Sequence, residues 1–191
     1  LCQRMSSPGP EDWEKMKRVG RYLKMRPRLV QLFAWQKEVG SIEVYSDSDW
    51  AGEKPSRRST SGGCIMRGLH CAKTWGKGQP MVTLSSAEAE LMAAAKSATE
   101  GRGYRNLLID FGKEATVKVH MDASAAIGML EKRGLGTTKH VDTKWMWIQG
   151  AIRRGDLQLQ KVGTHENPAD LMTKFLNAET TEKHLNFMGC W

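Results

Sequence analysis

The stretch IEVYSDSDW at residues 42–50 decides the fold, because an apolar strand pattern runs directly into a pair of carboxylates. Ile42, Val44 and Tyr45 carry the β-branched and aromatic side chains that are typical of strands. Asp47 therefore stands at the end of a strand, where side chains from remote parts of a sheet converge. Asp49 follows two residues later, and this spacing can place both carboxylates on one side of an extended backbone.

Other short runs of this kind, separated by glycine and proline, predict a sheet around the first strand. They comprise residues 29–35, 62–66, 70–75, 81–84, 116–121 and 157–162. The three runs between residues 62 and 84 follow one another through short turns, which favours an antiparallel meander.

Helical spacing of apolar residues predicts helices between and beyond these strands. They comprise residues 10–25, 85–111, 124–131 and 142–153, and a last helix that begins near Pro168. Ser85 can cap the longest of them, with Glu88 three residues later completing the cap. Gly101 and Gly103 weaken the middle of that helix by about 1 kcal/mol each. Strands followed by alternating helices and strands predict a mixed α/β sheet with helices on its faces.

Composition and charge exclude several classes of protein. The 191 residues are 40% hydrophobic and 26% charged, which suits one domain with a real core and excludes disorder throughout. No apolar run approaches the roughly 20 residues that cross a bilayer, and the start lacks a secretion signal, so we expect an intracellular protein without a membrane partner.

Four scattered cysteines indicate reduced thiols. The net charge is +8, and residues 1–40 hold nine of the 29 Lys and Arg but four of the 21 Asp and Glu. Because the chain begins with Leu1, we expect it to be a piece of a longer polypeptide.

Four carboxylates stand at strand ends or helix starts, where a sheet can bring them together. They are Asp47, Glu90, Asp122 and Asp170. Such a cluster repels itself unless cations are present, and hard oxygen ligands suit Mg²⁺ or Mn²⁺. Each residue taken alone is more often a solvated charge or a carboxylate at a helix N-terminus, and only the set indicates a metal site.

The motifs around these residues resemble the ribonuclease H domain of copia-type LTR retrotransposon Pol polyproteins. They read YSDSDWAG at 45–52, RSTSGG at 58–63, LSSAEAE at 84–90, TKHVD at 138–142 and NPADLMTK at 167–174. The resemblance implies a ribonuclease H-like three-layer α/β fold with a mixed five-stranded sheet flanked by helices. It places the ribonuclease H domain at residues 41–176, after a C-terminal remnant of the reverse transcriptase at 1–40. Residues 177–191 remain as a C-terminal tail.

The resemblance also implies the chemistry and the setting. It makes the four carboxylates the ligands of two Mg²⁺ ions about 4 Å apart, for which Mn²⁺ can substitute. The implied reaction is cleavage of the RNA strand of an RNA/DNA hybrid. His165 takes the place of a mobile histidine that helps product leave or shuttles a proton. The reverse transcriptase domain of the same polyprotein is the expected partner. The expected compartment is the cytoplasm or a virus-like particle.

Substrate contacts are predicted more broadly. The candidates are the hydroxyl groups of Ser59, Thr60, Ser61, Ser85 and Ser86 and the cationic or aromatic side chains of Lys139 and His140. Turn formation and helix capping are the alternative roles of the hydroxyl groups. Trp145 and Trp147 lie among apolar residues and favour core positions over base stacking.

Several alternatives stay open on the sequence. Asp49 is an alternative to Asp47 as a member of the carboxylate cluster. Glu88 is likewise an alternative to Glu90, but residues two apart on a helix point in different directions, so only one of these glutamates can enter the cluster. An integrase or transposase core shares the fold class, yet ends its acidic set with Glu, whereas Asp170 comes last here. A decayed domain that binds nucleic acid or supports a polymerase is a further alternative, because Ala123 follows Asp122 where the family has Asn. A zinc module on Cys64, His70 and Cys71 lacks a second ligand pair.

Overall fold

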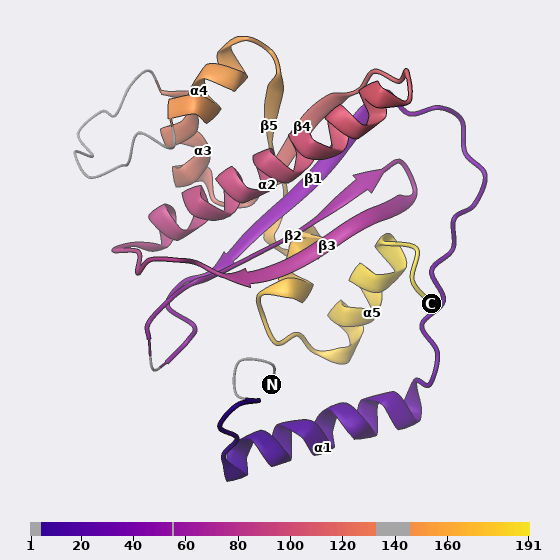
Figure 1. Cartoon of the computed structure of the whole chain (residues 1–191), viewed down its shortest axis with the longest axis vertical. Helices are drawn as coiled ribbons and strands as arrows, with labels where there is room; N and C mark the ends of the chain where they lie inside the picture. The colour runs from indigo at the N-terminus through magenta and orange to yellow at the C-terminus, as the bar shows by residue number, and fades with distance from the viewer. Residues whose placement is uncertain (1–4, 55, 133–145) are drawn as a thin grey trace.

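A five-stranded mixed sheet forms the centre of the chain in a computed structural model that describes residues 5–54, 56–132 and 146–191 (Figure 1). The strand order is β3-β2-β1-β4-β5. The bounds are β1 (Ser41–Asp49), β2 (Thr60–Arg67), β3 (His70–Gly78), β4 (Thr116–Met121) and β5 (Leu157–Lys161). β1, β2 and β3 pair antiparallel, whereas β4 runs parallel to both β1 and β5. The predicted mixed five-stranded sheet is thereby confirmed.

Helices cover both faces of the sheet. They are α2 (Ser86–Asp110), α3 (Ser124–Glu131), α4 (Met146–Arg153) and α5 (Ala178–Phe187), with the 3₁₀ turns η3 (Thr164–Glu166) and η4 (Pro168–Met172). The first helix, α1 (Pro10–Met25), lies apart from the sheet, beyond α5 (Figure 1). α2 crosses one face and is joined there by α3 and α4, while η4 and α5 lie on the other face (Figure 1). The predicted three-layer arrangement is confirmed.

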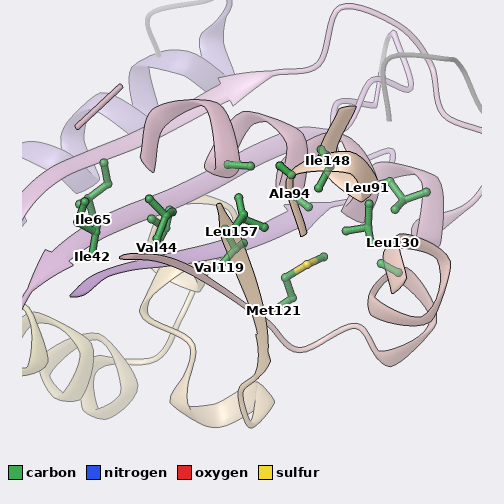
Figure 2. Packing of buried hydrophobic residues seen from close by; sticks show 14 of the residues in the cluster. Ile42, Val44, Ile65, Leu91, Ala94, Val119, Met121, Leu130, Ile148 and Leu157 are labelled. Carbon is green, nitrogen blue, oxygen red and sulfur yellow. The ribbon is translucent and has the colours of Figure 1, made fainter. Parts of the chain in front are cut away.

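The main core lies between α2 and the sheet. Ile42 and Val44 of β1 and Val119 of β4 are fully buried there (Figure 2). Val117 of β4 is also fully buried in this core, because alternate residues of a strand face the same side. α2 runs without a break through Gly101, where a Cβ would lie 2.7 Å from Val117 and 2.8 Å from Val44. The glycine therefore lets the helix approach the sheet closely, and this packing outweighs its low helix propensity.

Two predicted strands are wrong, one at residues 29–35 and one at 81–84. The first forms a single bridge, between Gln31 and Cys190. Its backbone hydrogen bonds go to residues 189–191 at the end of the chain, and most of its apolar side chains are exposed. In the second, the Thr83 carbonyl accepts a hydrogen bond from the Trp50 indole, and the Leu84 amide donates to Glu88. These backbone groups serve a turn and a helix cap, so no strand pairs with them.

The chain ends differ from the sequence expectation in one respect. The helix predicted to begin near Pro168 is the short turn η4, and a separate helix, α5, follows it. At the other end, α1 is confirmed with its predicted bounds, and Trp13 and Leu23 on it are 57% and 56% exposed. Within the described residues, no helix combines the length and the apolar character that crossing a bilayer requires. Residues 142–145 of the helix predicted at 142–153 lie outside the described residues.

Candidate metal centre

Three carboxylates from three separate elements meet at one edge of the sheet. Asp47 lies near the end of β1, Asp122 directly follows β4, and Glu90 lies in the second turn of α2. One ligand oxygen from each lies within 4.8 Å of the others. β1 and β4 are parallel neighbours, so their carboxyl ends reach the same edge, and α2 crosses above them. We call Asp47, Glu90 and Asp122 the acidic triad.

Glu90 holds one oxygen in place and leaves the other free for a ligand. Its Oε1 accepts hydrogen bonds from the Ser48 amide at 3.2 Å and the Ser48 hydroxyl at 2.7 Å. Its Oε2 is buried and has no hydrogen-bond partner among the residues that the structure describes. Burial raises the pKa of Glu90 to about 7, and the charges of Asp47 and Asp122 add to the rise. An unpartnered buried oxygen between two other carboxylates fits a hard divalent cation.

Asp47 is the most deeply buried member of the triad, with a side chain 1% exposed. The Thr173 hydroxyl donates to its Oδ2, and the Lys174 ammonium lies 3.0 Å from its Oδ1. Burial raises the pKa of Asp47, although the bonds from Thr173 and Lys174 act in the opposite direction. This aspartate is thus oriented by the segment that follows η4.

Asp170, the fourth predicted carboxylate, lies beside the triad and is linked to it by a lysine. Its Oδ1 lies 2.9 Å from the Lys174 Nζ, which also contacts Asp47. Asn167 anchors this segment, because its side chain donates to the Ser46 carbonyl at 2.9 Å and accepts from the Ala169 amide. A Cβ at Gly62 would lie 2.5 Å from the Thr173 methyl group, so glycine is needed for η4 to pack on β2. The structure therefore brings all four carboxylates to one region.

The remaining predicted site residues divide into structural and exposed positions. Ser59 is fully buried, accepts a hydrogen bond from the Ala51 amide and bonds the Thr83 hydroxyl. Ser85 caps α2 by accepting from the Glu88 amide at 3.2 Å. These contacts match the alternative of turn formation and capping. The buried Ser61 accepts from the Gln79 side chain at 2.9 Å.

Three further candidates are accessible, and two cannot be placed. Thr60 is half-buried, Ser86 is exposed, and His165 is exposed on η3, where its carbonyl accepts from the Lys183 ammonium. Lys139 and His140 lie outside the described residues, as does Trp145.

The neighbouring acids differ in their contacts. Asp49 is half-buried and is not a member of the triad. Glu88 accepts from the Leu84 amide at 2.7 Å, so it completes the cap of α2 while Glu90 enters the cluster. In the described ranges of the chain, the acidic triad is the only group of three or more metal-ligating side chains close enough to share an ion. Cys64, His70 and Cys71 accordingly do not form a zinc site.

Sequence reasoning assigned no role to Ser48, Thr173 or Lys174, although all three hold the carboxylates. The signal for Lys174 was its spacing of four residues from Asp170, which brings side chains together on a helical turn. Its contact with Asp47 spans 127 residues of sequence and has no local signal.

A groove with more cations than carboxylates, which we call the basic groove, lies between β3 and α2. Its volume is about 660 Å³, and its lining includes Arg58, Lys77, Lys96, Trp147 and the carboxylate of Glu53. Ser61 also lines the groove and pairs with Ser48, the residue that holds Glu90. Trp147 is half-buried against the main core, and the Arg102 guanidinium lies 5.6 Å from its ring centre. Three cations and an aromatic ring are suitable for a polyanionic ligand.

Comparison with known proteins identifies relatives over most of the chain. No family model matches. The chain is 31% identical over 173 residues to the retrovirus-related Pol polyprotein from transposon TNT 1-94 of Nicotiana tabacum, a match that covers 89% of this chain. It is 29% identical over 192 residues to the corresponding polyprotein from transposon RE1 of Arabidopsis thaliana, covering 99% of this chain. The chain spans 13% of the length of each polyprotein.

Solved structures identify the fold. LC11-RNase H1, isolated from compost, superposes with a TM-score of 0.56 at 17% identity, over 77% of this chain and 99% of its own. The same enzyme in complex with an RNA/DNA hybrid gives a TM-score of 0.52 at 15% identity, over 76% and 99%. Together with the sheet order, these likenesses show that the chain has a ribonuclease H-like fold, and the sequence matches show that it is similar to copia-type retrotransposon Pol polyproteins over most of its own length.

Proposed function

We propose that this chain is a metal-dependent ribonuclease H that hydrolyses the RNA strand of RNA/DNA hybrids by a two-ion mechanism. The observation that carries the proposal is the acidic triad, in which the buried Asp47 and Glu90 and the half-buried Asp122 converge and Glu90 keeps an unpartnered oxygen. Mg²⁺ is the proposed ion, with Mn²⁺ as a substitute, because the donors are hard oxygens. Ribonuclease H1 relatives of the same fold support the assignment.

Some residues of the chain are proposed to bind ions, and others to orient the ion-binding residues or to assist product release. Asp47, Glu90 and Asp122 would hold the first ion, and Asp170 would share the second with Asp47. When bound, the ions supply an activated water and neutralise charge on the departing oxygen. Ser48 and Thr173 keep Glu90 and Asp47 oriented through the hydrogen bonds described above. His165, exposed two residues before Asn167, is proposed to assist product release.

The proposed substrate reaches the triad along the basic groove. Arg58, Lys77 and Lys96 offer cations to backbone phosphates, and Ser61 offers a hydroxyl group within the groove. Thr60 and Ser86, which are half-buried and exposed, are proposed as further hydroxyl contacts. The hydroxyl groups suit recognition of the RNA 2′-hydroxyl. Lys139 and His140 are proposed as further backbone contacts from sequence alone. A solved structure of LC11-RNase H1 holds an RNA/DNA hybrid, which supports the same substrate class for this chain.

The test uses a labelled RNA/DNA hybrid with Mg²⁺, and single-stranded RNA and duplex DNA as controls. We expect cleavage of the RNA strand of the hybrid alone, and its loss in Asp122→Asn. Asp49→Asn is the matched control, because it removes an aspartate near the triad that is not a member of it. Hybrid binding without cleavage would instead support the alternative, a decayed domain that binds nucleic acid or supports a polymerase.

The reverse transcriptase segment of the same polyprotein is the proposed partner. The relatives are Pol polyproteins of which this chain matches 13%, so most of each relative lies outside the match. Residues 1–40 are proposed as the end of that segment, 41–176 as the ribonuclease H domain and 177–191 as a tail. α5, which occupies much of this tail, packs on η4 and buries His184.

A further inference from the structure

Lys174 places a positive charge between two carboxylates of the candidate metal centre. Its Nζ lies 3.0 Å from Oδ1 of Asp47 and 2.9 Å from Oδ1 of Asp170. Those carboxylates are 1% and 9% exposed, so water does little to offset the repulsion between them. The ammonium group therefore holds together two negative groups that repel each other.

A divalent ion shared by Asp47 and Asp170 would need the same oxygens. Mg²⁺ binds carboxylate oxygen at about 2.1 Å, so an ion between these two oxygens would lie close to where the ammonium group now lies. Two cations in that space repel each other strongly, because little water separates them. The ammonium group and a second ion consequently exclude one another, whereas the unpartnered oxygen of Glu90 does not depend on Lys174.

The lysine can leave without a change of fold. It lies just beyond η4, its side chain is 37% exposed, and the next residue, Phe175, is fully exposed. A flexible four-carbon stem can turn the ammonium group into solvent while Thr173 keeps its hydrogen bond to Asp47.

We propose that Lys174 is an internal counter-ion that holds the place of the second divalent ion in the substrate-free protein. The acidic triad then binds one ion readily, and a second ion binds only by displacing the lysine. This inference rests on the proposed metal-dependent function and assigns Lys174 a positioning role in it.

The first test counts ions in the absence of nucleic acid. Mn²⁺ is titrated into the purified chain, and free Mn²⁺ is measured by electron paramagnetic resonance. We expect one ion per chain for the unaltered protein and for Lys174→Arg. Lys174→Met should bind a second ion at least ten-fold more tightly than the unaltered protein does. The matched control is Lys183→Met, which removes a lysine that contacts the His165 carbonyl and none of the four carboxylates.

A second measurement uses the unaltered protein, in case Lys174→Met does not fold without ions. Amine acylation followed by peptide mass spectrometry reports whether Lys174 is paired or free. We expect its labelling rate to rise several-fold from limiting to high Mg²⁺, while that of Lys183 stays constant.

The outcomes separate the inference from the proposed function. Equal ion counts and affinities in the unaltered protein and Lys174→Met, or labelling that does not change with Mg²⁺, would overturn the role of Lys174 while leaving a metal-dependent nuclease intact. No ion binding by any variant would overturn the metal centre and the counter-ion role together.

Discussion

Replacing Glu90 with glutamine should stabilise the ion-free protein at alkaline pH and abolish ion binding. The carboxylate is 8% exposed and lies beside two others, so ionising it in the folded state is costly. Glutamine keeps an oxygen that can accept the two bonds from Ser48. Its amide nitrogen takes the position of the unpartnered Oε2 and can donate to Asp47 or Asp122.

The magnitude and its sign follow from proton linkage. Burial raises the pKa of Glu90 from 4.5 to about 7, and each pKa unit corresponds to about 1.4 kcal/mol. The folded state binds the extra proton, so the contribution of Glu90 to stability falls as pH rises from 4.5 to 7 and is constant above 7. The advantage of Glu90→Gln should therefore grow from near zero at pH 4 to at most about 3.5 kcal/mol at pH 8. For a chain of this length, that corresponds to a rise in Tm of roughly 7–14 °C.

The assay is thermal unfolding followed by circular dichroism, at pH 4 to 8, with a chelator and then with Mg²⁺. Mg²⁺ should raise the Tm of the unaltered protein and leave that of Glu90→Gln unchanged. Glu88→Gln is the matched control on the same helix, because its carboxylate caps the backbone at Leu84 and lies outside the triad. It should give no alkaline gain. If Glu90→Gln were no more stable than the unaltered protein at pH 8 with chelator, the argument from burial would be refuted.

Further substitutions test the packing that positions the site. Gly101→Ala should lower the free energy of unfolding by about 1–3 kcal/mol, because its Cβ would meet Val117 and Val44. Gly103→Ala in the same helix, where a Cβ would meet no atom within 4 Å, should raise the free energy of unfolding by up to about 1 kcal/mol. Urea unfolding measures both effects, and equal effects would contradict the close approach of α2 to the sheet. Asn167→Ala should cost about 1–3 kcal/mol in the same assay by leaving the buried Ser46 carbonyl without its donor, and an unchanged midpoint would show that η4 is anchored elsewhere.

The parts of the fold that the sequence predicted correctly are those with a strong local period. Residues 116–121 alternate strictly, and residues 10–25 and 124–131 keep helical spacing, so the local pattern and the final packing agree. Residues 29–35 and 81–84 are short apolar runs, and whether such a run becomes a strand depends on a partner elsewhere in the chain. The backbone of residues 29–35 bonds to residues 189–191, and the Leu84 amide bonds to Glu88 in the cap of α2.

The same distinction applies to the site. Asp47 and Asp122 were predictable because a carboxylate that ends a strand can meet one from a neighbouring strand. Glu90 was distinguished from Glu88 by the resemblance, and the structure adds the physical reason, since the Glu88 carboxylate is engaged at the cap. The contact of Lys174 with Asp47 depends on η4 packing against β2 at Gly62, and no local pattern encodes that approach.

The four carboxylates share one region but differ in how their charge is compensated. Asp47 and Asp170 are paired with Lys174, and Asp47 also accepts from Thr173, so the chain itself supplies a cation to both carboxylates and a hydroxyl donor to one of them. Glu90 has hydroxyl and amide donors on one oxygen and no donor on the other within the described residues. A cation bound at the triad would therefore compensate the buried charge of Glu90, while an ion shared by Asp47 and Asp170 would compete with a cation already present. Folding and ion binding are coupled most directly through the glutamate, because burial raises its pKa to about 7 and its Oε2 has no hydrogen-bond partner in the part of the chain that the structure describes.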